Sequence, residues 1–178
     1  MVKRILLLTG APGIGKTTVL IKTVDALKAK GISVGGIASR EAREGTVRVG
    51  FEIIDLTSGR QGWLAHINQK SGPQVGKYHV NIDDLNNIGA KAITQAIEKS
   101  EVIAIDEIGP MELYSPQFKT AVKQAVESKK PLLAVIHAKA QDPLILQTKQ
   151  RTDSEVFNVT IANRETLPQK LTKAIIGN

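Results

Sequence analysis

Cysteine is absent from the 178-residue sequence, and aromatic residues make up only 3% of it. The lack of cysteine excludes disulfide bonds and thiolate metal sites, so the chain is indifferent to the redox state of its compartment. We take the cytoplasm as its expected location. The scarcity of aromatic rings removes the stacking platforms on which single-stranded nucleic acids bind. Polynucleotide binding is therefore disfavoured, although the composition does not exclude it.

Long apolar runs and blocks of basic residues are missing as well. No run of about 18 apolar residues occurs, so the sequence predicts no membrane-spanning helix. The net charge is +7, but the 24 Lys and Arg residues are spread along the chain, which favours a small anionic ligand over a polynucleotide. With 42% hydrophobic and 23% charged residues, residues 1–178 have the composition of a single globular domain.

Apolar segments alternate with amphipathic segments along most of the chain. We predict core strands at 4–9, 33–39, 102–106, 131–137 and 156–160, and helices at 17–30, 83–100, 115–129 and from residue 166 onward. This alternation is typical of βαβ units, in which helices cover both faces of a parallel sheet. We therefore expect an α/β fold with a five-stranded, mainly parallel sheet between helices.

A glycine-rich segment lies between the first predicted strand and the first predicted helix. It reads Gly10-Ala11-Pro12-Gly13-Ile14-Gly15-Lys16-Thr17, with Thr18 next, and it matches the Walker A motif. The backbone N–H groups of such a loop and the positive end of the following helix attract phosphate. Lys16 can reach the β- and γ-phosphates, and the Thr17 hydroxyl can bind Mg²⁺. The segment thus predicts a P-loop site for a nucleoside triphosphate with Mg²⁺.

The strand predicted at 102–106 leads into two adjacent carboxylates, Asp106 and Glu107. A P-loop fold needs an acid at this position to hold Mg²⁺ through its water shell, and we assign that role to Asp106. Because side chains alternate along a strand, the second carboxylate is expected to have a separate role. We hypothesise that Glu107 orients and deprotonates the attacking water. Glu112 is interpreted as structural, with a role near magnesium as the alternative.

The segment 40–67 interrupts the βα alternation. Apolar residues alternate with polar or small residues over 47–53, and Thr-Ser-Gly at 57–59 supplies a turn before 61–66. This period of two predicts a β-hairpin insertion. The next segment, 68–79, is rich in Gly, Gln and Lys without periodicity, and we expect a loop there, either near the nucleotide or at the surface.

His137 is a candidate sensor of the γ-phosphate. P-loop proteins with a glutamate beside the metal-binding aspartate usually place one further strand between the P-loop strand and the strand of that aspartate, which points to 132–136. His137 would then follow that strand at the edge where ligands bind in open α/β folds. The alternative is a surface histidine that ends the strand.

Arginines outside the loop can meet charge that develops during phosphoryl transfer. Arg43 and Arg48, beside the loop into the hairpin, are the first candidates, and Arg151 is another because it follows a helix near the expected active-site edge. The alternative is a solvated basic hairpin.

Asn163 and Arg164 follow the fifth predicted strand, where other P-loop proteins contact the base. The amide can donate hydrogen bonds and the guanidinium can stack on a ring. The alternative is an irregular lead into the last helix, which the sequence from Thr166 to Gln169 opens in the form of a capping box.

Several of these segments together carry a family resemblance. They are the Walker A segment, the run Asp106-Glu107-Ile108-Gly109-Pro110-Met111-Glu112-Leu113, the hairpin segments Arg43-Glu44-Gly45 and Arg48-Val49-Gly50-Phe51, and Asn163-Arg164. With them the chain resembles the small nucleoside triphosphatases first described in thermophiles, which include the cancer-related nucleoside triphosphatase. The resemblance covers nearly the whole chain. It implies a RecA-like five-stranded core and Mg²⁺-dependent hydrolysis of ATP, GTP and other nucleoside triphosphates to diphosphate and phosphate, with loose base selection. Pro110 departs from it, since many relatives are expected to carry a basic residue there.

Two interpretations other than hydrolysis remain open. A small-molecule or nucleotide kinase would carry the same loop, but it needs an acceptor pocket and usually an arginine-rich lid, and no arginine cluster follows the fourth strand beyond Arg151. A nucleotide-dependent switch or a nucleic-acid-associated module is kept open by the charge of +7. The sequence specifies neither the oligomeric state nor the base preference.

Overall fold

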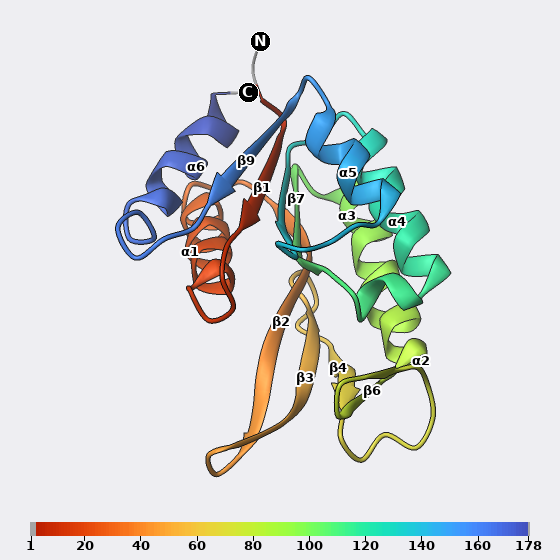
Figure 1. Cartoon of the computed structure of the whole chain (residues 1–178). Helices are drawn as coiled ribbons and strands as arrows, with labels where there is room; N and C mark the ends of the chain where they lie inside the picture. The colour runs from red at the N-terminus through yellow and green to blue at the C-terminus, as the bar shows by residue number, and fades with distance from the viewer. Residues whose placement is uncertain (1–2, 178) are drawn as a thin grey trace.

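The apolar segments of the chain assemble into one nine-stranded sheet with helices on both faces (Figure 1). The structure is a computed structural model that describes residues 3–177. The strand order is β5-β6-β4-β3-β2-β7-β8-β1-β9. From β2 to β9 the neighbouring strands pair in parallel, and from β2 to β5 they pair antiparallel.

The bounds of the elements are as follows. The strands are β1 (Ile5–Thr9), β2 (Val34–Glu44), β3 (Val47–Asp55), β4 (Gln61–His66), β5 (Gln74–Val75), β6 (Tyr78–Val80), β7 (Val102–Ile108), β8 (Leu132–Ile136) and β9 (Ser154–Asn158). The helices are α1 (Lys16–Ala29), α2 (Ile82–Asp84), α3 (Lys91–Lys99), α4 (Pro116–Glu127), α5 (Pro143–Gln150) and α6 (Leu167–Ile176), with a π-helical segment η1 (Leu85–Ala90) and a 3₁₀ turn η2 (Glu112–Tyr114).

The central strands are buried on both faces, as their continuous apolar sequences predict. Ile5 and Leu7 of β1 join the hydrophobic cluster that packs under α3 and α4, whereas Leu6 and Leu8 join the cluster that packs under α1 and α6. All four side chains are fully buried. The predicted α/β architecture with a mainly parallel five-stranded core is confirmed, and it aligns the carboxyl ends of β1, β7 and β8 along one edge.

The hairpin insertion is a continuation of the core sheet. β2 pairs with β7 over 34–37 and then continues past the core, pairing with β3 over 37–44. The prediction that the second strand ends at residue 39 was therefore wrong, because β3 supplies hydrogen-bond partners for the backbone beyond that point. Figure 1 shows β2 and β3 extending beyond the edge at which β1 ends.

Three further predictions of local structure need correction. The segment 68–79 contains β5 and the start of β6, whose few residues are too short to show a period. β7 extends to Ile108 instead of ending at 106, and β9 spans 154–158 instead of 156–160. No capping box forms at Thr166, which has helical backbone angles and makes no side-chain cap; its hydroxyl donates to the Asn163 carbonyl instead.

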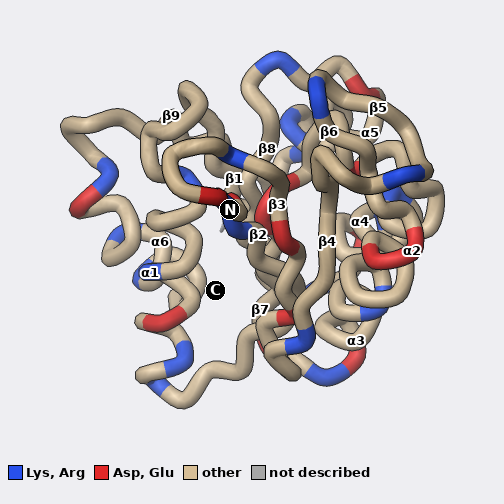
Figure 2. The backbone as a smooth tube through the Cα atoms, turned by 90° about the horizontal axis from the view of Figure 1, so that it is seen from below, with Lys and Arg blue, Asp and Glu red and all other residues tan. Residues whose placement is uncertain are grey.

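Charged residues are spread over the described chain. Figure 2 shows Lys and Arg distributed around the molecule with Asp and Glu between them. This arrangement agrees with the scattered basic residues of the sequence. Among residues 3–177, no helix combines the length and the apolar character that crossing a membrane requires.

Candidate active site

The Walker A loop connects β1 to α1, and its glycines are required by its backbone. Gly10, Gly13 and Gly15 have φ angles of 143°, 73° and 110°, which residues with side chains rarely adopt. A Cβ on Gly10 would also lie 2.8 Å from the carbonyl oxygen of Val159. The loop is thus held both by its own conformation and by the chain that follows β9.

Lys16 is the first residue of α1 and folds back over the loop. Its Nζ donates hydrogen bonds to the carbonyl oxygens of Gly10 and Ala11, each at 2.9 Å. The positive charge of Lys16 also lowers the pKa of Glu107, against the larger effect of burial, which raises it. The ammonium group is therefore bonded to the phosphate loop and is near enough to act on the carboxylate predicted to be the base.

Asp106 is brought to Thr17 and to Ser39, and its side chain is almost completely buried, with an exposed fraction of 1%. Burial raises the pKa of Asp106 to about 6, the nearby charge of Glu107 adds to this rise, and hydrogen bonds with Thr17 and Ser39 oppose it. The Ser39 hydroxyl donates to Asp106 Oδ2 at 3.2 Å. The structure therefore joins the two predicted metal ligands, Thr17 and Asp106, in one contact.

Ser39 is a member of this site that the sequence analysis did not identify. The only local signal was a hydroxyl side chain at the end of the strand predicted at 33–39. Its relevance depends on β2 lying next to β7 in the sheet, and this neighbour relation becomes known only from the strand order.

Glu107 and Glu112 complete the acidic part of the site. Glu107 is half-buried, and the pairing of β7 with β8 is irregular around it, with a register shift between Ile105 and Ile108. Glu112 is buried, and its Oε2 accepts a hydrogen bond from the backbone N–H of Gly109 at 3.1 Å. Asp106 thus contacts Thr17 and Ser39, while Glu107 lies toward Lys16, so the two adjacent carboxylates have different surroundings.

His137 directly follows β8, which lies between β1 and β7 as predicted. Its backbone N–H donates to the Ile108 carbonyl at 3.3 Å, so the residue is attached to the end of the strand that carries Asp106 and Glu107. Its Nδ1 accepts the backbone N–H of Lys139 at 3.3 Å. The position at the shared edge is as expected from the sequence, and the sensor role stays a prediction.

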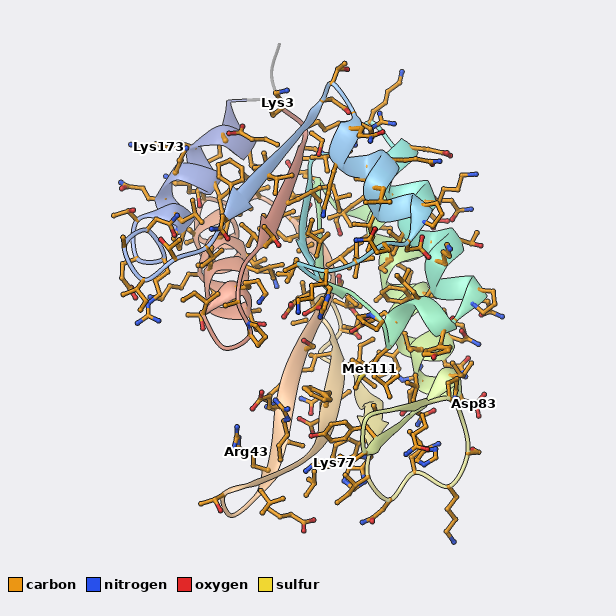
Figure 3. The ribbon with its side chains drawn as sticks, in the orientation of Figure 1. Lys3, Arg43, Lys77, Asp83, Met111 and Lys173 are labelled. Atoms are coloured by element: carbon orange, nitrogen blue, oxygen red, sulfur yellow. The ribbon has the colours of Figure 1, made fainter. Side chains whose placement is uncertain are left out.

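Arg43 and Arg48 lie opposite each other on β2 and β3, and both bind Glu41. The N–O distances are 2.9 Å for Arg43 and 2.7 Å for Arg48. Arg48 also donates to the Tyr78 hydroxyl at 2.9 Å and lies over the Phe51 ring. Figure 3 shows Arg43 on the hairpin extension, away from the end of β1. In this structure both arginines therefore bind other residues of the hairpin insertion, and Arg48 also binds its neighbour Tyr78.

Arg151 does not lie at the predicted edge. Its Nε donates to Asp153 Oδ1 at 2.8 Å, and the Asp153 carbonyl accepts the backbone N–H groups of Arg4 and Ile5 at the start of β1. Since β9 runs parallel to β1 and begins at Ser154, Arg151 lies at the opposite edge from the Walker A loop. The prediction of an arginine near the active site at this position was wrong.

Arg164 packs on the Walker A loop, whereas Asn163 stabilises the turn before α6. Arg164 Nη1 donates to the Ile14 carbonyl at 3.4 Å, and its Cδ lies 3.7 Å from the position of a Cβ on Gly15. The Asn163 amide donates to the Asn158 carbonyl and accepts the backbone N–H of Thr160, each at 2.9 Å. Of the two predicted base contacts, only the guanidinium therefore touches the loop.

Comparison with known proteins identifies the family of this chain. A family model described as NTPase matches residues 5–172. The nucleoside-triphosphatase THEP1 of Thermofilum pendens is 47% identical over 170 residues, which cover 95% of this chain and 93% of that protein, and THEP1 of Methanosarcina acetivorans is 46% identical over 169 residues, 94% of each.

Solved structures agree with the sequence comparison. The crystal structure of THEP1 from Aquifex aeolicus superposes with a TM-score of 0.85 at 28% identity, covering 96% of this chain and 98% of that one. The solution structure of a human cancer-related nucleoside triphosphatase gives 0.83 at 33% identity, covering 98% of both chains. The resemblance inferred from the sequence is confirmed. The chain belongs to the NTPase family and is an enzyme that hydrolyses nucleoside triphosphates.

Proposed function

We propose that residues 1–178 form one catalytic domain that hydrolyses ATP, GTP and other nucleoside triphosphates to the diphosphate and phosphate, with Mg²⁺ and with loose base selection. The observation that carries this proposal is the convergence of Lys16, Thr17, Asp106 and Glu107 at one edge of the sheet. An ammonium group, a metal-binding pair and a base are the groups that phosphoryl transfer to water requires.

Thr17 and Asp106 would hold Mg²⁺. A hydroxyl next to a buried carboxylate offers the oxygen ligands that Mg²⁺ prefers, and this cation usually binds through one or two carboxylates together with waters and substrate phosphates. The residues present therefore fit the ion. When bound, Mg²⁺ offsets the charge of the β- and γ-phosphates. The hydroxyl of Ser39 keeps the Asp106 carboxylate oriented.

Glu107 would take a proton from the attacking water. The water oxygen forms a bond to the γ-phosphorus, the bond from that phosphorus to the β,γ-bridging oxygen breaks, and the diphosphate leaves with the electron pair. Burial raises the pKa of Glu107, and a raised carboxyl pKa suits a general base near neutral pH. Lys16 would exchange its bonds to Gly10 and Ala11 for phosphate oxygens and so meet the charge on the leaving group.

The remaining predicted residues would act at the γ-phosphate and the base. We keep His137 as the γ-phosphate sensor, because it follows β8 at the same edge. Arg43 or Arg48 would assist transfer only after releasing Glu41. At the base, the Arg164 guanidinium can stack on any ring, while the Asn163 amide is already bonded within its turn. The contact that is free to reach the base is thus one that accepts any ring, which supports loose base selection.

Arg164→Ala is expected to raise KM for ATP, GTP, CTP and UTP by a similar factor. Loss of a stacked guanidinium costs about 1–2 kcal/mol, or roughly 5- to 30-fold in affinity. Initial-rate measurements with each nucleotide test this, with Arg60→Ala in the turn between β3 and β4 as the control. A change confined to one nucleotide would show that Arg164 reads the identity of the base.

Phosphate release from each of the four nucleoside triphosphates tests the proposed function as a whole. We expect steady release without any acceptor molecule, and its loss when EDTA removes the divalent cation. Release that requires an acceptor would indicate a kinase. Release that depends on added polynucleotide would indicate a nucleic-acid-associated module. Equal rates with Mg²⁺ and with EDTA would contradict the metal requirement.

A further inference from the structure

Glu112 is a buried acid to which the proposed reaction gives no role. It opens η2, after the short turn that follows β7, and only 6% of the residue is exposed. Within the described residues 3–177, each ion pair of the structure involves other side chains. Because a buried carboxylate is costly without a cation, its presence here calls for a physical reason.

The carboxyl groups of Glu107 and Glu112 both lie at Gly109, close to where a side chain would stand. A Cβ at Gly109 would lie 2.6 Å from Glu107 Oε1 and 3.1 Å from Glu112 Oε2. The φ angle of Gly109 is outside the left-handed region, so glycine is needed here for space and not for backbone freedom. The Gly109 N–H donates to Glu112 Oε2 at 3.1 Å. Glu112 therefore fixes the turn against which the Glu107 head group packs.

The buried Glu112 has two other acids nearby, the buried Asp106 and the half-buried Glu107. Burial raises the pKa of Glu112 to about 8, the charges of Glu107 and Asp106 add to the rise, and two backbone N–H groups oppose it. Burial and the neighbouring acids thus favour the protonated form of Glu112, whereas the charge of Lys16 favours the ionised form of Glu107. Neighbouring acids with such different surroundings can take different roles.

We propose that Glu112 is a positioning residue for hydrolysis, which anchors the turn at Gly109 and so directs Glu107 toward the attacking water. The proposal rests on the assignment of Glu107 as the base. Glu112 acts through its place in the turn and touches neither the nucleotide nor the water.

Glu112→Gln and Glu112→Leu test this proposal in the whole chain. Glutamine keeps an oxygen that can accept the Gly109 N–H and is neutral, so we expect its kcat to stay close to that of the parent. Leucine removes the acceptor, and we expect kcat to fall by about 10- to 100-fold, a usual loss when an outer supporting group is removed. KM for Mg-ATP should be unchanged in both, because the Walker A loop is untouched.

Thermal unfolding of each variant shows whether it folds. A third variant, Glu112→Asp, completes the experiment. Aspartate keeps the acid but shortens the side chain, so it should lose kcat as leucine does, and it serves if the leucine variant does not fold. A parent-like kcat in the shortened or apolar variant would overturn the proposal. Equal losses for glutamine and aspartate, with KM raised alike, would also overturn it, because they would indicate a merely structural role.

A double variant separates this proposal from the assignment of the base. If Glu112 acts through Glu107, adding Glu112→Leu to Glu107→Gln should lower kcat no further. Additive losses would show that Glu112 acts independently of Glu107. A fully active Glu107→Gln single variant would instead show that Glu107 is not the base. If Glu112→Leu were inactive in that case, the effect of Glu112 could not pass through Glu107, and the proposal would be contradicted.

Discussion

Glu107→Gln is expected to lower kcat for nucleoside-triphosphate hydrolysis by about 100-fold or more, since a general base contributes on the order of 10²–10⁴. The glutamine has the same shape but cannot take a proton from water. The affinity for Mg-ATP should stay close to that of the parent, because Lys16, Thr17 and Asp106 remain. Single-turnover phosphate release measures the chemical step, and a fluorescent nucleotide measures binding.

The matched control for this variant is Glu98→Gln, at an exposed position of α3. It changes the net charge by the same amount at a position away from the site, so kcat for hydrolysis and the affinity for Mg-ATP should both be unaffected. Turnover by Glu107→Gln at the rate of the parent would refute the assignment of the base. A loss of binding equal to the loss of turnover would show instead that Glu107 acts mainly in holding the nucleotide.

Lys16→Ala is expected to weaken the binding of Mg-ATP by about 2–5 kcal/mol, the usual cost of removing one partner of a buried, hydrogen-bonded charge pair. The ammonium group lies in the loop and donates to the Gly10 and Ala11 carbonyls, whereas the Arg164 guanidinium contacts the loop at Ile14. Isothermal titration calorimetry measures the loss. Lys22→Ala, on the exposed side of the same helix, is the control and should bind as the parent does.

Asp106→Ala, combined with Lys16→Ala, gives the sharper form of this test. Without the carboxylate, Thr17 is the remaining proposed metal ligand, so the difference between ATP binding with Mg²⁺ and with EDTA should largely disappear. If the double variant still held Mg-ATP as tightly as the parent, the proposed phosphate site would be wrong. A difference between Mg²⁺ and EDTA as large as that of the parent would place the main metal ligand elsewhere.

Much of the phosphate site could be predicted because its residues are close together in the sequence. The Walker A loop is one continuous segment whose glycines, lysine and threonine act through their own backbone and side chains. Asp106 and Glu107 could be added because they follow an apolar run, and P-loop folds need an acid at such a position. The place of 132–136 between β1 and β7 was also predicted correctly, and it put His137 at the shared edge.

Contacts between residues that are far apart in the sequence could not be found in the same way. Ser39 and Asp106 are 67 positions apart, and their hydrogen bond depends on β2 lying next to β7. Arg164 reaches the carbonyl of Ile14 across 150 positions. Arg151 was placed at the wrong edge because the sequence alone does not show that β9 begins there and runs parallel to β1.

The sequence by itself determined the alternation of strands and helices, the phosphate loop, the acid pair and the resemblance to the NTPase family, because each depends on neighbouring residues or on a short period. Only the tertiary structure decided which side chains support the acids: Ser39 beside Asp106, and Glu112 behind Glu107 across Gly109. The physical reason is that burial and charge proximity set the states of these carboxyl groups, and both arise only when the strands are packed side by side.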